Sequence, residues 1–98
     1  MFADRYAGDG VLVNAVCPGP TRSELWMAEG GLLDQSKQLG GHASREEALE
    51  TAGSKRPIGR LAEVEEIADA IAFLCSERAS YVAGAAWSVD GGTVQVII

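Results

Sequence analysis

The chain has 98 residues, of which 47% are hydrophobic, and this share is typical of a globular protein rather than of a disordered segment. Its length allows one domain at most, with a modest core. The net charge of -6, without a basic run, excludes a typical nucleic-acid-binding protein, and no apolar run approaches the roughly 20 residues of a membrane-spanning helix.

The cysteine and histidine content argues against disulfide and metal sites. Cys17 and Cys75 are too few for a disulfide framework, and we expect both to be buried thiols. His42 is the only histidine, so no metal site is expected. The N-terminus lacks a basic stretch followed by an apolar core, so we expect no signal peptide and a cytoplasmic location.

The first predicted elements are the end of a helix and a buried strand. Phe2 and Tyr6 are spaced to share one face of a helix over residues 1–7, which the glycines of residues 8–10 end. Residues 11–16 form a short apolar run, which predicts a strand buried on both faces in a parallel sheet. Asn14 interrupts this run, and we expect its amide to brace the backbone of the turn that follows.

That turn is the first candidate binding site. Pro18 and Gly19 end the strand, and Pro20, Thr21 and Ser23 follow at its carboxyl end. Ligands of open α/β sheets bind in the crevice outside the carboxyl ends of the strands. The hydroxyl groups of Thr21 and Ser23 are therefore well placed to meet a ligand.

Residues 24–55 form an irregular region of three short predicted helices, which are broken at residues 30–31 and 40–41. Ser44 is typical of a residue that caps the third of these helices. A long glycine-broken insertion directly after a ligand-facing turn suggests a mobile lid, with a poorly ordered surface loop as the alternative. Trp26 either covers a substrate or anchors the insertion through its large apolar area.

Residues 63–75 carry the clearest helical pattern. Val64, Ile67, Ile71 and Leu74 share one face, which we expect to pack on the sheet, and the acidic residues of the first turn suit the helix dipole.

A final buried strand is predicted over residues 85–89. A right-handed crossover would make it the parallel neighbour of the first strand. We expect Asp90 to bond the backbone of the turn that follows, and the apolar tail of residues 94–98 to dock on something, such as another subunit.

Together these segments resemble the short-chain dehydrogenase/reductase family, and in particular its 3-oxoacyl-carrier-protein reductase-like members. The family's last-but-one strand and Pro-Gly turn are similar to residues 11–19. Further pieces follow in the family's order and spacing: Arg56-Pro57-Ile58-Gly59-Arg60-Leu61, Glu66-Ile67-Ala68, Phe73-Leu74, Tyr81-Val82-Ala83-Gly84 and Val89-Asp90-Gly91-Gly92. The resemblance covers about nine-tenths of the chain and weakens only through residues 24–55.

The resemblance implies an α/β fold, namely the C-terminal portion of a Rossmann-type doubly wound parallel sheet with its last two strands, lid and one core helix. Residues 1–98 would be a single partial domain, and residues 24–55 would be the substrate lid, with Trp26 at its start. The turn residues Pro18, Gly19, Pro20, Thr21 and Ser23 would bind the nicotinamide end of NAD or NADP. Ser23 stands where threonine is commoner in the family. The implied partners are a small carbonyl or alcohol substrate and further copies of the chain in a homo-oligomer.

The family's phosphate-binding loop and its catalytic Tyr-x-x-x-Lys pair have no counterpart in the sequence. Tyr6 is followed four positions later by Gly10, and Tyr81 by Ala85. We therefore expect no catalytic residue in this chain and no tight binding of NAD(P) by it alone. Two interpretations stay open. The chain is the C-terminal segment of an NAD(P)-dependent oxidoreductase, either as a fragment or as a short protein, or it is a non-catalytic oligomerisation module that uses its last helix and strand.

Overall fold

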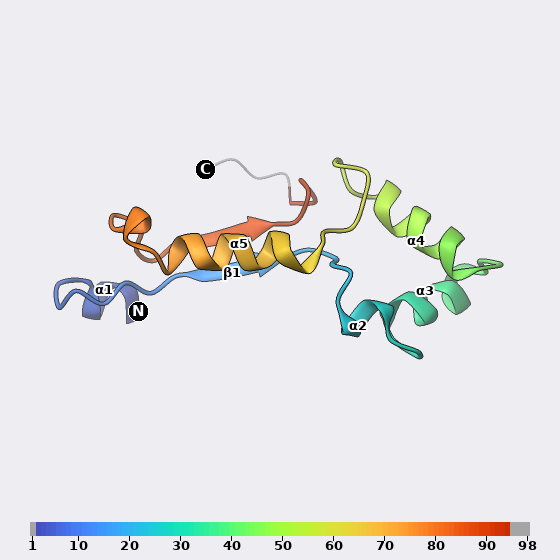
Figure 1. The fold of residues 1–98 in the computed structure, drawn as a ribbon, viewed down its shortest axis with the longest axis horizontal. Coiled ribbons are helices and arrows are strands. Elements are labelled where there is room, and N and C mark those ends of the chain that lie inside the picture. Colours follow the sequence, from blue (N-terminus) through green and yellow to red (C-terminus); the bar gives the residue numbers. More distant parts are fainter. Residues whose placement is uncertain (1, 95–98) are drawn as a thin grey trace.

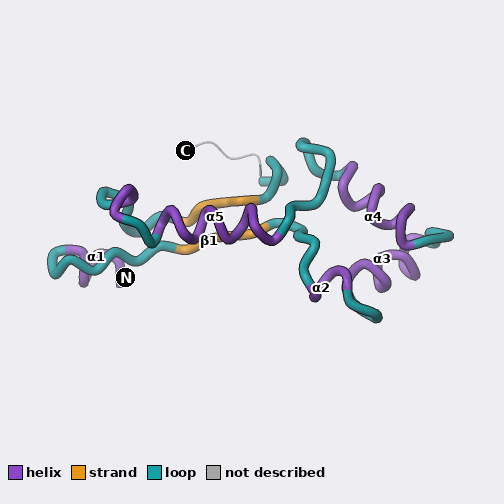
Figure 2. The backbone as a smooth tube through the Cα atoms, in the orientation of Figure 1, coloured by secondary structure: helices purple, strands orange, loops and turns teal. Residues whose placement is uncertain are grey.

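The computed structural model describes residues 2–94 of the chain. In chain order the elements are α1 (Phe2–Ala7), β1 (Ala15–Pro18), α2 (Glu24–Met27), α3 (Leu32–Gly40), α4 (Arg45–Ser54), α5 (Val64–Leu74), the 3-10 helix η1 (Glu77–Ala79) and β2 (Ala86–Val89) (Figure 2). The α/β class and the order of the elements agree with the prediction.

β1 and β2 are parallel neighbours in one sheet, as predicted. Ala15 lies opposite Ala86, and Pro18 lies opposite Val89. Helix α5 connects the two strands in the chain and lies along β1 (Figure 1). On the same helix the ring of Phe73 stacks on that of Trp87 in β2, with 5.5 Å between the ring centroids. Helix α5 therefore contacts both strands and covers one face of the sheet.

The first strand begins later than the apolar run predicted. Of this region only Ala15–Pro18 forms a strand, whereas residues 11–13 are exposed coil. The N–H of Gly84 still donates to the carbonyl of Val13 at 2.9 Å, so the two chain segments already run side by side there.

Asn14 braces the backbone, but not at the turn that was expected. Its amide nitrogen donates to the carbonyl of Val82, and its amide oxygen accepts from the N–H of Ala85, both at 2.9 Å. The side chain thus ties the start of β1 to the loop before β2. The expectation placed it at the following turn, which is held instead by Thr21.

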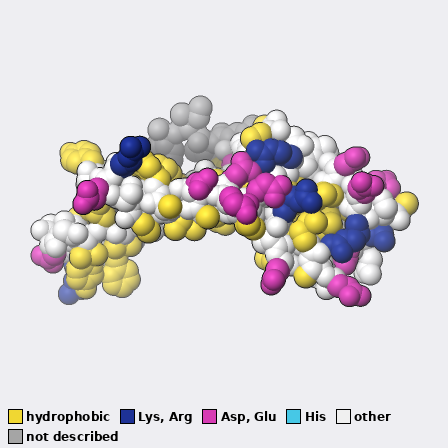
Figure 3. Space-filling model, in the orientation of Figure 1, with side chains coloured by type: hydrophobic (Ala, Val, Ile, Leu, Met, Phe, Trp, Pro, Cys, Tyr) yellow, Lys and Arg dark blue, Asp and Glu magenta, His cyan; other side chains and the backbone are white. Residues whose placement is uncertain are grey.

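The expected burial of the sheet and of α5 was wrong. Neither strand is buried on both faces, and on α5 the side chains of Val64 and Ile71 are 45% and 47% exposed. Cys17 and Cys75 are exposed free thiols rather than buried ones. A two-stranded sheet with one helix against it has an uncovered second face, and hydrophobic side chains lie at the surface over the region of α5 and β1 (Figure 3).

Residues 24–55 form a helical insertion at the far end of the molecule from α1 (Figure 1). Its helices break where the glycines predicted, and Gly41 adopts the left-handed conformation, with φ of 67°, at the end of α3. The hydroxyl of Ser44 accepts from the N–H of Glu47 at 3.1 Å, as expected for an N-cap. Leu33, Ala48 and Ala52 are buried in its small core. The first of these helices, α2, ends at Met27, before the glycine break at residues 30–31.

The molecule is elongated, with extents of 54 × 27 × 22 Å. Its radius of gyration is 16.7 Å, whereas a compact chain of this length would have one of about 13 Å. No helix among residues 2–94 is long and apolar enough to cross a membrane. The expected docking of the apolar tail falls on residues beyond this range, apart from the exposed Val94.

Candidate functional site

The turn after β1 lies against the turn after β2. The N–H of Gly19 donates to the carbonyl of Val89 at 2.9 Å. A Cβ atom on Gly19 would stand 2.8 Å from both the Cα and the Cβ atoms of Asp90. Only glycine allows this approach, so the residue type at position 19 brings the carboxyl ends of the two strands together.

A second set of contacts ties the same turn to the segment before α5. The N–H of Arg22 donates to the carbonyl of Ala62 at 2.8 Å, and the N–H of Ala62 donates to that of Pro20 at 3.0 Å. These bonds form a parallel bridge between Thr21 and Ala62. Thr21 is only 8% exposed, and its hydroxyl donates to the carbonyl of Gly19 at 2.8 Å. The hydroxyl of Thr21 therefore stabilises the turn.

Ser23 has the more available hydroxyl of the two that the sequence singled out. It occupies the N-cap position of α2, yet its side chain makes no capping hydrogen bond. Its N–H donates to the carbonyl of Thr21 at 2.7 Å, which fixes the backbone at this point. The side chain is half-buried and lies at the edge of a surface hollow.

That hollow has a volume of about 380 Å³ and lies between the turn and α2. It gathers the five residues that the resemblance assigned to the cofactor together with Trp26, and it adds Leu25. Its lining is Pro18, Gly19, Pro20, Thr21, Ser23, Leu25 and Trp26. Leu25 was not among the residues predicted for this site. The one feature of the sequence that could have indicated it is its position next to Trp26, shortly after the turn. The lining contains no titratable side chain, so it supplies binding surface rather than a general acid or base.

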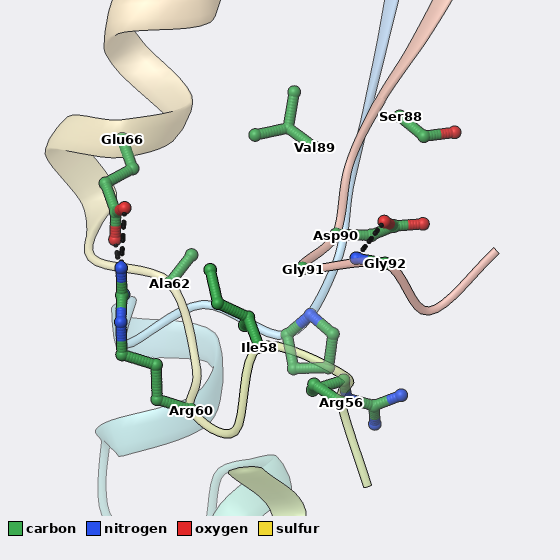
Figure 4. A pocket seen from close by; sticks show the side chains of 11 residues that line it. Arg56, Ile58, Arg60, Ala62, Glu66, Ser88, Val89, Asp90, Gly91 and Gly92 are labelled. Carbon is green, nitrogen blue, oxygen red and sulfur yellow. Dashed lines mark hydrogen bonds and ion pairs between the residues drawn. The ribbon is translucent and has the colours of Figure 1, made fainter. Parts of the chain in front are cut away.

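A second hollow, of about 240 Å³, lies between residues 56–62 and the turn after β2. Two nitrogen atoms of the Arg60 guanidinium donate to the Glu66 carboxylate at 2.7 and 3.0 Å (Figure 4). These bonds, followed by one from the N–H of Glu63 at 2.9 Å, lower the pKa of Glu66 to about 2. The same pairing raises the pKa of Arg60. The pair fixes the first turn of α5, which agrees with a structural role for its glutamates.

The turn after β2 is held by its own aspartate, as predicted. The Asp90 carboxylate accepts from the N–H groups of Gly92 and Val94, both at 3.0 Å. Gly91 has a φ of +63°, and a Cβ atom there would lie 2.5 Å from Cγ2 of Ile58. The turn thus packs closely against the Arg56-Pro57-Ile58 segment (Figure 4). Within residues 2–94 no cluster of three or more His, Cys, Asp or Glu side chains is arranged to hold a metal ion.

Known proteins share this sequence and arrangement. The sequence model of the family described as Enoyl-(Acyl carrier protein) reductase matches residues 1–94. The chain is 42% identical over 96 residues to 2-(S)-hydroxypropyl-CoM dehydrogenase 3 of Xanthobacter autotrophicus, and the match covers 98% of this chain and 34% of that protein.

Solved structures give the same result. A short chain dehydrogenase family protein from Francisella tularensis superposes with a TM-score of 0.85 at 28% identity, covering 97% of this chain and 38% of that one. L-sorbose reductase from Gluconobacter frateurii, solved in complex with NADPH and L-sorbose, superposes with a TM-score of 0.80 at 31% identity, covering 98% and 35%.

The chain spans about a third of the length of these relatives. Its two parallel strands, crossover helix and helical insertion superpose on one part of their Rossmann-type fold. Because the family match extends over nearly the whole sequence, the chain belongs to the short-chain dehydrogenase/reductase family.

Proposed function

We propose that this chain is the C-terminal segment of an NAD(P)-dependent oxidoreductase, which transfers hydride between the nicotinamide cofactor and a carbonyl or alcohol substrate. In this proposal residues 24–55 are the substrate lid. The observation that carries it is the hollow at the carboxyl ends of β1 and β2, because it joins the Pro-Gly turn to the first helix of the insertion. Ligands of open α/β sheets bind at this edge.

The turn suits the neutral carboxamide of a nicotinamide ring. Such a group is best held by fixed peptide dipoles and by hydroxyl groups rather than by charges. Hydrogen bonds to Val89 and Ala62 fix the turn backbone, and the Ser23 hydroxyl makes no capping bond to α2. When bound, the cofactor supplies the hydride, and these residues hold and orient its nicotinamide end.

Alone, the chain is proposed to be inactive and to bind NAD(P) weakly. The sequence contains no Tyr-x-x-x-Lys pair to move a proton. The turn offers a few neutral hydrogen bonds of about 0.5–1.5 kcal/mol each. Immobilising a ligand costs roughly 4 kcal/mol or more, so these bonds do not suffice without a site for the pyrophosphate.

A chimera tests the proposal. Residues 1–94 replace the matching third of 2-(S)-hydroxypropyl-CoM dehydrogenase 3, the 42% identical relative. We expect the chimera to oxidise or reduce a small alcohol or carbonyl with NAD(P), and the chain alone to show no turnover. Ser23→Ala in the chimera should raise KM for the cofactor, whereas Ser54→Ala in α4 should not. A folded chimera without turnover on any of a panel of alcohols and ketones would contradict the proposal.

An oligomerisation module is the second candidate, and it is favoured by the exposed apolar side chains of α5 and of residues 11–13. Light scattering on the purified chain tests it. A stable homo-oligomer that Ile71→Glu dissociates, together with an inactive chimera, would favour the module over the oxidoreductase segment. In either case we propose a reducing cytoplasmic setting, since Cys17 and Cys75 are free and exposed.

A further inference from the structure

The wall that α2 contributes to the hollow after β1 is apolar and uncharged. Leu25 is 67% exposed, and Trp26 is half-buried beside it. An exposed leucine on a short helix is poorly explained by packing within the insertion, whose buried core lies in α3 and α4. The Leu25 side chain is thus available to whatever occupies the hollow.

No charged side chain lines this hollow. Arg22, which precedes Ser23, lines a different depression and lies 3.9 Å from the Glu63 carboxylate. Arg45 pairs with Asp34 at 3.2 Å, and its guanidinium also donates to the carbonyl of Met27, the last residue of α2. A separate polar hollow is lined by Glu29, Asp34, Lys37, His42 and Arg45 among others. Both arginines near α2 thus have carboxylate partners, and neither lines the hollow after β1.

We propose that the part of the substrate that lies against α2 is uncharged and apolar, and that Leu25 and Trp26 select for it. This inference rests on the proposed function, because it names the substrate class of the same hollow. A carboxylate, sulfonate or phosphate on that part of the substrate would lose water of hydration against this wall and find no cation in return. An aliphatic or aromatic group would instead remove apolar surface from water.

The test uses the full chain and needs no cofactor. The sequence has two tryptophans, so a nitrogen–proton NMR correlation spectrum contains two indole signals, of which Trp87 in β2 is the internal reference. The probes are 1-phenylethanol and 4-(1-hydroxyethyl)benzoate, which share one scaffold and differ by a carboxylate. We expect 1-phenylethanol to shift the Trp26 signal with an affinity at least about tenfold higher than the benzoate.

Two variants with the same change in net charge distinguish the effect of the wall on probe affinity from the effect of the overall charge. Leu25→Lys adds a cation inside the hollow and should bring the two affinities together or reverse their order. Leu39→Lys adds the same charge to α3 at a leucine that is 91% exposed and lies outside the hollow, and it should leave the ratio unchanged. Equal affinities in the natural chain, no shift of Trp26 with either probe, or equal effects of the two variants would overturn the inference.

The outcome is distinguishable from that of the proposed function. An active chimera combined with no preference between the two probes would leave the oxidoreductase assignment standing and refute the apolar wall. A clear preference combined with an inactive chimera would refute hydride transfer while keeping the binding property of the hollow.

Discussion

Replacing Asn14 with alanine removes both hydrogen bonds between the start of β1 and the loop before β2. The carbonyl of Val82 and the N–H of Ala85 each lose a partner at 2.9 Å. Net contributions of about 1 kcal/mol for each bond predict a loss of roughly 2 kcal/mol in the free energy of unfolding. For a domain of this size, this corresponds to a decrease in Tm of about 8–16 °C.

Thermal unfolding followed by circular dichroism measures that decrease, and amide hydrogen exchange at Ala85 reports it locally. Gln38→Ala, at an exposed position of α3, serves as the control and should leave both quantities unchanged. A Tm for Asn14→Ala within about 2 °C of the natural chain would refute the reasoning, since two bonds in the connection of the strands would then contribute almost nothing. Unaltered exchange at Ala85 would refute it as well.

Three further substitutions test other parts of the fold. Gly19→Ala should lower Tm by forcing the ends of the strands apart, because the new Cβ would stand 2.8 Å from two atoms of the residue after β2, whereas Gly8→Ala, with nothing within 4 Å, should be tolerated. The pKa of Glu66 lies near 2 rather than at its usual 4.5, so its ionised form stabilises the fold above about pH 4.5, and this contribution is lost as the pH falls toward 2. Tm measured against pH should therefore fall less steeply over this range in Glu66→Gln than in the natural chain, whereas Gln38→Ala, which removes no titratable group, should keep the natural slope. Ile71→Ala should cost less than the 2–5 kcal/mol typical of a buried isoleucine, because that side chain is 47% exposed, and a chemical denaturation curve showing the full loss would reveal a covering partner.

Local chemistry made the order of elements and the membership of the hollow predictable. Glycines at residues 30–31 and 40–41 and the Ser44 cap act on their immediate neighbours, so the breaks between α2, α3 and α4 follow from them. The rule that ligands meet the carboxyl ends of parallel strands likewise led to the turn with Pro18 and Ser23, and the insertion directly after that turn led to Trp26. The structure brings the three residues together in one hollow.

These local rules could not predict which apolar side chains are buried, or which residues far apart in the sequence contact each other. Apolar character at Ile71 and along residues 11–13 indicates a surface that avoids water, but it does not say whether another element is present to cover it. The partners of Asn14 lie 68 and 71 positions away, and no local pattern identifies them. Leucine is a common core residue, so the sequence alone does not single out Leu25. Only the three-dimensional position of α2 shows that Leu25 lines the hollow.

The parallel bridge between Thr21 and Ala62 brings the two ends of the helical insertion to a single point. For a segment with adjacent ends, doubling its length adds only about 0.6 kcal/mol of closure entropy. The segment between these two residues can therefore change in length without moving β1, β2 or the turns that follow them. Such a change would alter the end of the molecule that holds α2, α3 and α4, while the sheet and α5 keep their arrangement.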